Sequence, residues 1–466
     1  MRSFSGICFA LAAWALCATT ASAQGNWADA GMPGRTVGSL QLVVDPELGL
    51  MAIGNITETD NFNAPIIPCY KDGVWSILRG FRGNVTDATR YGDTLVVSGA
   101  LYAVVEEDGD SVLVVSVAAY YDEGWHPYGD FGAIDLVRRV KVLDGELYAI
   151  GVFLQADGEL CNSIAKRMGG QWVPVGGLQV LWPNNAPVLY DAIIYQNDLY
   201  ICGNLNLAPN DERGIIRYDG QAWSAPGGGI FGGAATGLAM AVYQDELYVG
   251  GSFYQTGGNP GHMIQRWNGN EWRAVGDHLT NANNDFTTSA RVDGFFTYQD
   301  KLLVAGGFKH AGGVPAQTFA IWDGIRWCGT GDSISNLSHS IALYNDTIYL
   351  ANGRVVNGDS TNCVVKWVSG ALEGSVCSEP MSVQNHHSLG AAAFVVHPSA
   401  HGQWTLLGLP SGIQRLDLFD SKGALVHQAS IAIDPQGRGL LQMPELSPGL
   451  YTCRAAGQRP ARLAVE

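Results

Sequence analysis

The sequence of 466 residues predicts an all-β protein, and three observations carry that prediction. Glycine contributes 60 residues, about twice its usual share of roughly 7%, which is typical of many tight turns. Charged residues reach only 15% against a typical value of about 25%, which disfavours long amphipathic helices, while 13 Trp and 18 Tyr favour strands. The third observation is a phrase of similar sequence that recurs every 45 to 55 residues.

The recurring phrase opens with an apolar pair, as in Leu247-Tyr248. The first residue of this pair stands at seven places: Leu50, Leu95, Leu147, Leu199, Leu247, Leu302 and Ile348. Repeats of this length indicate a radial or solenoid array, in which each copy is one supersecondary unit. Residues 24–380 therefore form one repeat domain by this prediction.

Each copy is predicted to contain four antiparallel strands. In the fifth copy these strands are GLAMAVY, LYVGGSF, HMIQRW and EWRAV, and the last two flank Asn268-Gly269. Such pairs favour type I′ hairpin turns, and Asp72-Gly73, Asp219-Gly220 and Asp323-Gly324 occupy matching places. Four strands in about 50 residues are typical of a propeller blade. The sequence therefore predicts a seven-bladed β-propeller of four-stranded blades.

A glycine follows each opening position by four residues, except that the last copy has an asparagine. These residues are Gly54, Gly99, Gly151, Gly203, Gly251, Gly306 and Asn352. Because glycine and asparagine tolerate positive φ best, we expect every copy to demand a positive φ there.

A tryptophan follows the hairpin turn in six copies, at Trp75, Trp125, Trp172, Trp223, Trp272 and Trp327. The seventh copy offers Leu372 instead, whereas the segment around Trp27 reads like the outer-strand phrase EWRAVG. We therefore predict that the N-terminal strand completes the seventh blade and closes the ring, which also protects strand edges. The recurring Trp and Tyr are interpreted as packing between blades.

The first 23 residues have the pattern of a secretory signal peptide. Arg2 precedes an apolar run from Ile7 to Cys17, and Ala21-Ser22-Ala23 forms a small-residue cleavage site. The mature chain is expected to begin near Gln24 and to be exported. No later stretch reaches the 18 or more consecutive apolar residues of a membrane span, so we expect no transmembrane segment.

Charge and cysteine content narrow the classes of partner and site. The formal net charge of −16 disfavours nucleic acid, because an acidic surface repels phosphates. The seven cysteines that follow residue 23 are too sparse for a disulfide scaffold and lack CxxC pairs. If a bridge forms, we expect it between Cys363 and Cys377, across a hairpin that turns at Ser369-Gly370.

No catalytic motif, cofactor site or metal site is assigned. The chain has no GxSxG elbow, HExxH helix or phosphate-binding loop. Asp108–Asp110 and Asn281–Phe286 are interpreted as polar loops rather than calcium sites, and His386-His387 as solvated. Five histidines fall in or near connecting segments, where a propeller places functional groups: His126, His262, His278, His310 and His339.

The repeats resemble those of kelch-type propellers. The resemblance rests on the order of Tyr248, Gly250-Gly251, Trp267 and Trp272, although the spacing is tighter than in kelch repeats. The whole phrase is more similar to repeats of bacterial secreted proteins. It covers about residues 24–380 and implies a fold alone, since propellers include enzymes, scaffolds and binders.

After a linker at residues 381–391, residues 392–466 predict a small β-sandwich of short alternating strands. This tail resembles the type A sorting domain of type IX secretion in Bacteroidota. The matching segments are Val396–Ser399, Gly402–Leu406, Leu416–Asp420 with Gly423, and Leu446–Tyr451. The resemblance implies that the secretion machinery is a partner and that the protein reaches the cell surface or the medium.

The sequence favours a secreted or cell-surface, non-catalytic propeller that binds a protein or carbohydrate partner. One alternative is a hydrolase or lyase at the central mouth of the ring. It would require two carboxylates, or a histidine and a carboxylate, about 5 to 10 Å apart. The other alternative is a structural envelope protein without a small ligand.

Overall fold

The computed structural model describes most of the chain from Trp27 to Val465. The residues outside this description are 1–26, 62, 106–110, 115, 133–135, 182–186, 257–258, 282–289, 336–339, 369–371, 373–375, 379–394, 401–402, 408–411, 420–424, 435–437, 443–448, 456–460 and 466. The predicted signal peptide, the predicted linker and His339 therefore lie outside the described residues. The chain divides into two compact units, Met1–Ser378 and Glu379–Glu466.

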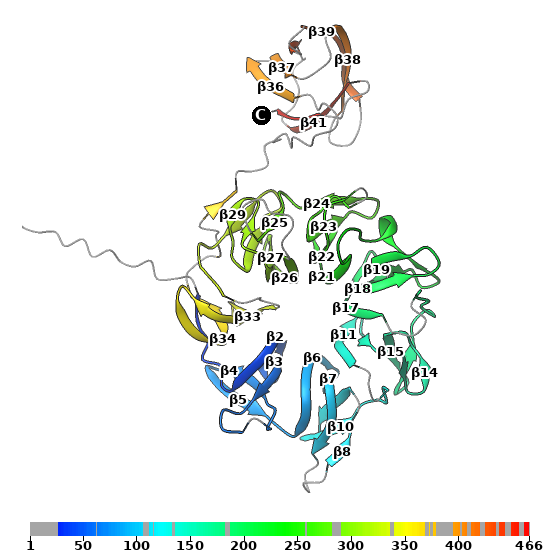
Figure 1. The fold of residues 1–466 in the computed structure, drawn as a ribbon, viewed down its shortest axis with the longest axis vertical. Coiled ribbons are helices and arrows are strands. Elements are labelled where there is room, and N and C mark those ends of the chain that lie inside the picture. Colours follow the sequence, from blue (N-terminus) through cyan, green and yellow to red (C-terminus); the bar gives the residue numbers. More distant parts are fainter. Residues whose placement is uncertain are drawn as a thin grey trace, which may run out of the picture. The chain divides into compact units, whose positions relative to one another are not determined.

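The described residues of the first unit form seven antiparallel sheets around a common centre (Figure 1). The first sheet consists of β2 (Arg35–Asp45), β3 (Gly49–Thr57), β4 (Ile67–Lys71) and β5 (Val74–Leu78). The second consists of β6 (Phe81–Tyr91), β7 (Thr94–Val105), β9 (Val117–Tyr121) and β10 (Gly124–Pro127), and β8 (Ser111–Leu113) also pairs with β7. The third consists of β11 (Leu136–Leu143), β12 (Glu146–Val152), β15 (Ile164–Met168) and β16 (Gln171–Pro174).

The next three sheets repeat this order of strands along the chain. The fourth sheet consists of β17 (Val188–Tyr195), β18 (Asp198–Leu207), β19 (Glu212–Tyr218) and β20 (Trp223–Ser224). The fifth consists of β21 (Thr236–Tyr243), β22 (Glu246–Ser252), β23 (Ile264–Trp267) and β24 (Trp272–Ala274). The sixth consists of β26 (Arg291–Tyr298), β27 (Lys301–Gly307), β30 (Phe319–Trp322) and β31 (Trp327–Gly329), and β35 (Val376–Cys377) pairs with the outer edge of β31. Short accessory elements complete the unit: β13 (Gln155–Ala156), β14 (Glu159–Leu160), η1 (Pro226–Gly228), β25 (Leu279–Thr280), β28 (His310–Ala311) and β29 (Val314–Pro315).

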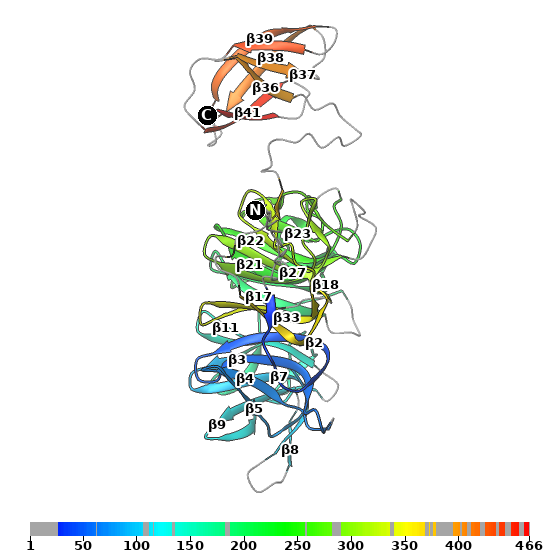
Figure 2. The same cartoon turned by 90° about the vertical axis from the view of Figure 1, so that its left-hand side faces the viewer.

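The seventh sheet joins the two ends of the repeat domain. Its strands are β32 (Ile341–Tyr344), β33 (Thr347–Val356), β34 (Asp359–Trp367) and, outermost, β1 (Trp27–Asp29). Trp27 lies opposite Trp367 in an antiparallel pair, and the ring centroids of the two residues are 5.2 Å apart. The N-terminal strand thus closes the ring, as its sequence predicts, and the chain is a β-propeller. Figure 2 shows this unit from its edge, where successive sheets lie side by side.

The tryptophans that follow the hairpin turns link each sheet to its predecessor. Every indole nitrogen donates a hydrogen bond of 2.6 to 3.1 Å to a backbone carbonyl just after the outer strand of the preceding sheet. The pairs are Trp75 with Ala30, Trp125 with Arg79, Trp172 with Tyr128, Trp223 with Gly176, Trp272 with Pro226 and Trp327 with Val275. The large rings fill the spaces between sheets, and their polar atoms are satisfied there. These tryptophans therefore hold the ring together.

The repeated glycines correct one prediction. Positive φ occurs at Gly99 (154°) and Asn352 (64°), but not at Gly54, Gly151, Gly203, Gly251 or Gly306. Each of these glycines lies instead where the backbone of the first strand comes close. A Cβ at Gly151 would lie 2.1 Å from the Leu136 carbonyl oxygen, and Gly99, Gly203, Gly251 and Gly306 give 2.0 to 2.2 Å. The requirement for glycine is steric: no side chain fits beside that strand.

The disulfide prediction is also wrong. The bridge joins Cys328 to Cys377, which lie opposite each other on β31 and β35. The chain does not fold back onto β34 after the seventh sheet but adds β35 to the outer edge of the sixth. Cys363 stays a buried free thiol on β34, and its sulfur lies 3.0 Å from the Thr36 hydroxyl.

The second unit is a small β-sandwich, as predicted. One sheet holds β36 (Val395–Ala400), β37 (Gln403–Leu407) and β40 (Arg438–Gln442); the other holds β38 (Gly412–Phe419), β39 (Leu425–Ile433), β41 (Gly449–Ala455) and β42 (Ala461–Val465). A core that includes Leu406, Leu416, Ile433 and Leu441 draws side chains from both sheets. Among the described residues of the whole chain, no helix has the length and apolarity needed to cross a membrane.

Candidate functional site

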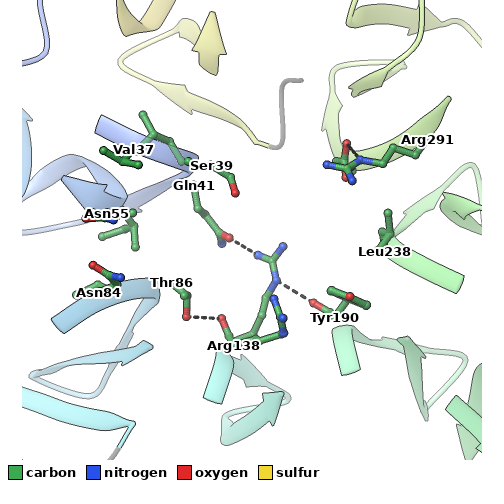
Figure 3. A pocket seen from close by; sticks show the side chains of 17 residues that line it. Val37, Ser39, Gln41, Asn55, Asn84, Thr86, Arg138, Tyr190, Leu238 and Arg291 are labelled. Carbon is green, nitrogen blue, oxygen red and sulfur yellow. Dashed lines mark hydrogen bonds and ion pairs between the residues drawn. The ribbon is translucent and has the colours of Figure 1, made fainter. Parts of the chain in front are cut away.

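A polar cavity of about 520 Å³ lies at the centre of the ring, among the first strands of the sheets (Figure 3). We call it the central cavity. It is lined by Val37, Gly38, Ser39, Leu40, Gln41, Ile53, Gly54, Asn55, Asn84, Val85, Thr86, Arg138, Arg139, Tyr190, Leu238, Arg291 and Asp293. Strands β2, β6, β11, β17, β21 and β26 all contribute, so the lining comes from most of the ring.

One structural device supplies five of the lining residues. The pairing of the first two strands skips one residue in each of five consecutive sheets, which is the register of a β-bulge. The skipped residues are Thr86, Arg138, Tyr190, Leu238 and Asp293, and every one of them lines the central cavity. Because a bulge redirects a side chain without breaking the sheet, the ring presents a variable residue at a fixed place.

The residues that follow two of these bulges, Asp87 and Arg139, form a hydrogen-bonded network with Gln41. The Gln41 amide donates to Asp87 at 2.7 Å and accepts from Arg139 Nη1 at 2.6 Å. Arg139 Nε also donates to the Tyr190 carbonyl oxygen at 2.9 Å. The guanidinium of Arg139 is thereby fixed across three sheets.

Asp87 belongs to this network, and a second buried aspartate, Asp191, lies near enough to be influenced by the charge of Arg139. Asp87 also accepts from the Val140 amide at 3.2 Å, and burial raises its pKa to about 6, although Arg139 opposes that rise. Asp191 meets Lys141 Nζ at 2.7 Å and accepts from the Met240 amide at 2.9 Å. Burial disfavours the charge of Asp191, but Lys141 and Arg139 together lower its pKa below the ordinary value. Both carboxylates are therefore used inside the protein.

Arg138 differs from the other two arginines of the central cavity. Its guanidinium carbon lies 5.1 Å from the centre of the Tyr190 ring, in a cation–π arrangement. Its Nε is buried and has no hydrogen-bond partner among the described residues. Arg291, in contrast, pairs with Asp293 at 3.0 Å. The lining thus contains three arginines and one carboxylate, in a protein whose overall charge is −16.

Of the five histidines singled out from the sequence, the four that the structure describes do not line this cavity. His126 stacks on Tyr121 at a centroid distance of 4.0 Å on the outer hairpin of the second sheet. His262 is buried beside Tyr254 and His278, and burial lowers its pKa to about 4. His310 lies in β28.

The loops considered for calcium lie almost entirely outside the described residues. Asp108–Asp110 falls wholly outside them, and of Asn281–Phe286 only Asn281 is described. Within the described part of the chain, no group of three or more His, Cys, Asp or Glu side chains could hold a metal ion.

Sequence reasoning did not identify Arg138, Arg139 or the residues around them. They belong to first strands, which were recognised only as apolar strands of a repeat. A signal was nevertheless present: aligned by the repeat, the bulge position carries Thr86, Arg138, Tyr190, Leu238 and Asp293, five different chemistries at one place. When a position recurs in every sheet but carries a different residue each time, the fold does not require a particular side chain there.

No known family matches this chain, and no curated protein matches it. Among solved structures, the chain is similar to YjhT, with a TM-score of 0.34 and 14% identity over 62% of this chain and 96% of that one. It is similar to a protein of unknown function from Bacteroides thetaiotaomicron, with a TM-score of 0.34 and 12% identity over 73% and 74% of the two chains.

A third similar structure is an exo-β-1,3-galactanase from Phanerochaete chrysosporium in complex with β-1,3-galactotriose. Its TM-score is 0.27 and its identity 10%, over 94% of this chain and 98% of that one. At these scores and identities the three similarities say nothing about the central cavity.

Proposed function

We propose that this chain is an exported, non-catalytic β-propeller that binds a protein or carbohydrate partner at the central cavity. One observation carries the proposal: five bulges place five different side chains into a single polar cavity of about 520 Å³. Cavities of roughly 300 to 1,000 Å³ with a few converging polar groups are the usual form of ligand sites.

The arrangement of charges supports binding rather than catalysis. Acid–base chemistry requires a titratable group within hydrogen-bonding reach of the substrate. Asp293 is the lining carboxylate of the central cavity, and it pairs with Arg291. Asp87 and Asp191 are 3% and 6% exposed and accept hydrogen bonds from protein donors. Their contacts suit a role in positioning Arg139 and Lys141.

Binding at the central cavity is tested with the full chain on arrays of glycans and of cell-surface proteins. The variant Asn84→Trp fills the cavity from an exposed lining position, and Gln171→Trp on the outer strand β16 is the matched control. We expect at least one retained partner, with binding lost in Asn84→Trp and kept in Gln171→Trp. Equal binding by both variants would place the partner elsewhere and contradict the proposal.

The enzyme alternative is tested by incubating the same protein with panels of glycosides and esters. Turnover that Asn84→Trp abolishes would replace the binding function with catalysis. For the structural alternative, the full chain is used to recover partners from intact cells, where recovery unaffected by Asn84→Trp would favour an envelope scaffold.

The export route in this proposal is a signal peptide followed by type IX secretion. It is supported by the sequence of residues 1–23 and by the resemblance of residues 392–466 to a type A sorting domain. In a host with that machinery, removal of residues 392–466 should leave the protein in the periplasm. Appearance of the truncated protein in the medium or at the cell surface would contradict the route.

A further inference from the structure

We propose that the ligand of the central cavity is an anionic saccharide whose acidic group is bound by Arg138. This inference rests on the proposed function and adds the chemistry of the ligand and the residue that selects it. Three features of the cavity support it: the hydrogen bonding of its arginines, its balance of charge, and the neutral polar groups of its lining.

Hydrogen bonding separates Arg138 from its neighbours. Arg139 donates hydrogen bonds from Nε to the Tyr190 carbonyl oxygen and from Nη1 to Gln41. Arg291 forms an ion pair with Asp293. Arg138 makes no such bond among the described residues, and the flat Tyr190 ring supports its guanidinium. The buried Nε of Arg138 therefore has no acceptor among the described residues, and Arg138 is one of the lining residues of the central cavity. A guanidinium that the protein leaves short of acceptors is the one of the three that a ligand oxygen would stabilise most.

The charge balance of the cavity points to an anionic partner. Lys141 neutralises Asp191, Arg139 lies next to Asp87 through their shared contact with Gln41, and Arg291 neutralises Asp293. These pairs leave the charge of Arg138 uncompensated within the described part of the cavity. The planar guanidinium donates two parallel hydrogen bonds to a group with two or more oxygens. A carboxylate or a sulfate ester provides that group.

The neutral part of the lining points to a saccharide. Ser39, Asn55 and Asn84 supply a hydroxyl and two amide groups to the cavity that Arg138 lines (Figure 3). The side chains of Gln41 and Thr86 also line it but are hydrogen-bonded to protein groups. Amides and hydroxyls both donate and accept, which is what the hydroxyl groups of a sugar require. A cavity of about 520 Å³ accommodates a short oligosaccharide, within the size range of small-molecule sites.

The inference is tested by calorimetric titration of the full chain with three ligands of one size. These are trigalacturonate, a sulfated trigalactoside and the neutral trigalactoside. At least one acidic trisaccharide should bind at least tenfold more tightly than the neutral one, and added salt should reduce the difference. Which acid binds better identifies the acidic group as carboxylate or sulfate.

The variant Arg138→Met keeps the apolar stem and removes the charge. We expect at least a tenfold loss of affinity for the acidic trisaccharide and less than a twofold change for the neutral one. Arg273→Met is the matched control, since Arg273 pairs with Glu271 on the outer hairpin of the fifth sheet. Arg138→Lys should recover part of the affinity, and equal melting temperatures establish that the variants are folded.

Three results would overturn the inference. One is equal binding of the neutral and acidic trisaccharides. Another is binding of an acid that Arg138→Met leaves unchanged. The third is preference for triglutamate over every trisaccharide, which would assign the site to an acidic peptide. In all three cases the proposed function would still hold if Asn84→Trp abolished binding of the partner that is found. If Asn84→Trp left that binding unchanged, both the proposed function and this inference would be wrong.

Discussion

Asp87 and Asp191 occupy the same register position two sheets apart, yet their pKa values move in opposite directions. Asp191 has Lys141 Nζ at 2.7 Å, and its pKa is lowered. Asp87 receives its hydrogen bonds from neutral donors, Gln41 and the Val140 amide, so burial dominates and raises its pKa to about 6. One carboxylate therefore favours the fold when charged, and the other favours it when protonated.

The contribution of Asp87 to stability is predicted to fall as the pH rises. Burial raises its pKa from the ordinary value of 3.8 to about 6 in the folded protein. Its stabilisation is therefore fully present below pH 3.8 and is lost as the pH rises to about 6. Two pKa units correspond to about 3 kcal/mol. Urea unfolding of the wild type and of Asp87→Asn between pH 4 and 7 measures this contribution as the difference between the two free energies of unfolding.

The free energy of unfolding of the wild type, relative to Asp87→Asn, should decrease between pH 4 and pH 6 and remain constant above that. A difference that increases over this range would mean that Asp87 is ionised in the folded protein below its ordinary pKa. The difference between the wild type and Asp87→Asn at pH 7 is the reference against which the differences at lower pH are compared.

Single residues of the site could not be predicted from the sequence, although the strands that carry them could. Arg138 stands in the segment LVRRVKVL, which alternation assigns to a strand with either arginine facing inward. The bulge between Val137 and Arg139 brings both into the lining, and a bulge has no signature in one strand alone. The converging partners, Gln41 and Tyr190, come from sheets about 50 or more residues away.

At the scale of elements, the bulge on the first strand and the repeated glycine on the second strand lie beside each other and depend on each other. In five sheets the skipped residue lies next to the place where the second strand carries its glycine, for example Gly151 opposite Val137. The second strand must pass close to the bulged backbone, and a side chain would prevent the contact. The glycine was visible in the sequence, but its cause was not, because positive φ and close approach select the same residue.

Gly151→Ala is predicted to destabilise the protein by about 3 kcal/mol, because its Cβ would lie 2.1 Å from the Leu136 carbonyl oxygen, which is backbone and cannot rotate away. Gly124→Ala is the control, since its Cβ would meet its first neighbour, His126, at an ordinary 3.4 Å. Chemical unfolding of both variants measures the two free energies. Equal stabilities would refute the steric explanation.

At the scale of the molecule, the ring depends on a strand of three residues from the N-terminus. Trp27 is 4% exposed and lies in one core with Phe319 and Leu372. The sequence predicted this closure because the phrase around Trp27 supplies the strand that the seventh copy lacks. The same comparison could not predict the disulfide, since the position of β35 depends on where the chain leaves the ring.

Removing the closing strand should weaken the whole propeller. Trp27→Ala is predicted to cost about 4 kcal/mol, the usual loss for a buried tryptophan. Deletion of residues 24–34 should lower the melting temperature further, because it removes the strand as well. Val74→Ala, at a position 68% exposed on an outer strand, is the control. A melting temperature that the deletion leaves unchanged would mean that the seventh sheet does not need β1.

The bridge between Cys328 and Cys377 determines where a pulling force enters the propeller. Tension applied to the chain beyond Ser378 reaches Cys377 first, and the bridge passes it to β31 in the sixth sheet. The hydrogen bonds between β1 and β34 are then not in series with that tension. While the disulfide is intact, a pull on the chain beyond Ser378 is carried by the sixth sheet and leaves the pairing of β1 with β34 unloaded. Once it is reduced, only the short pairing of β35 with β31 separates that pull from the seventh sheet.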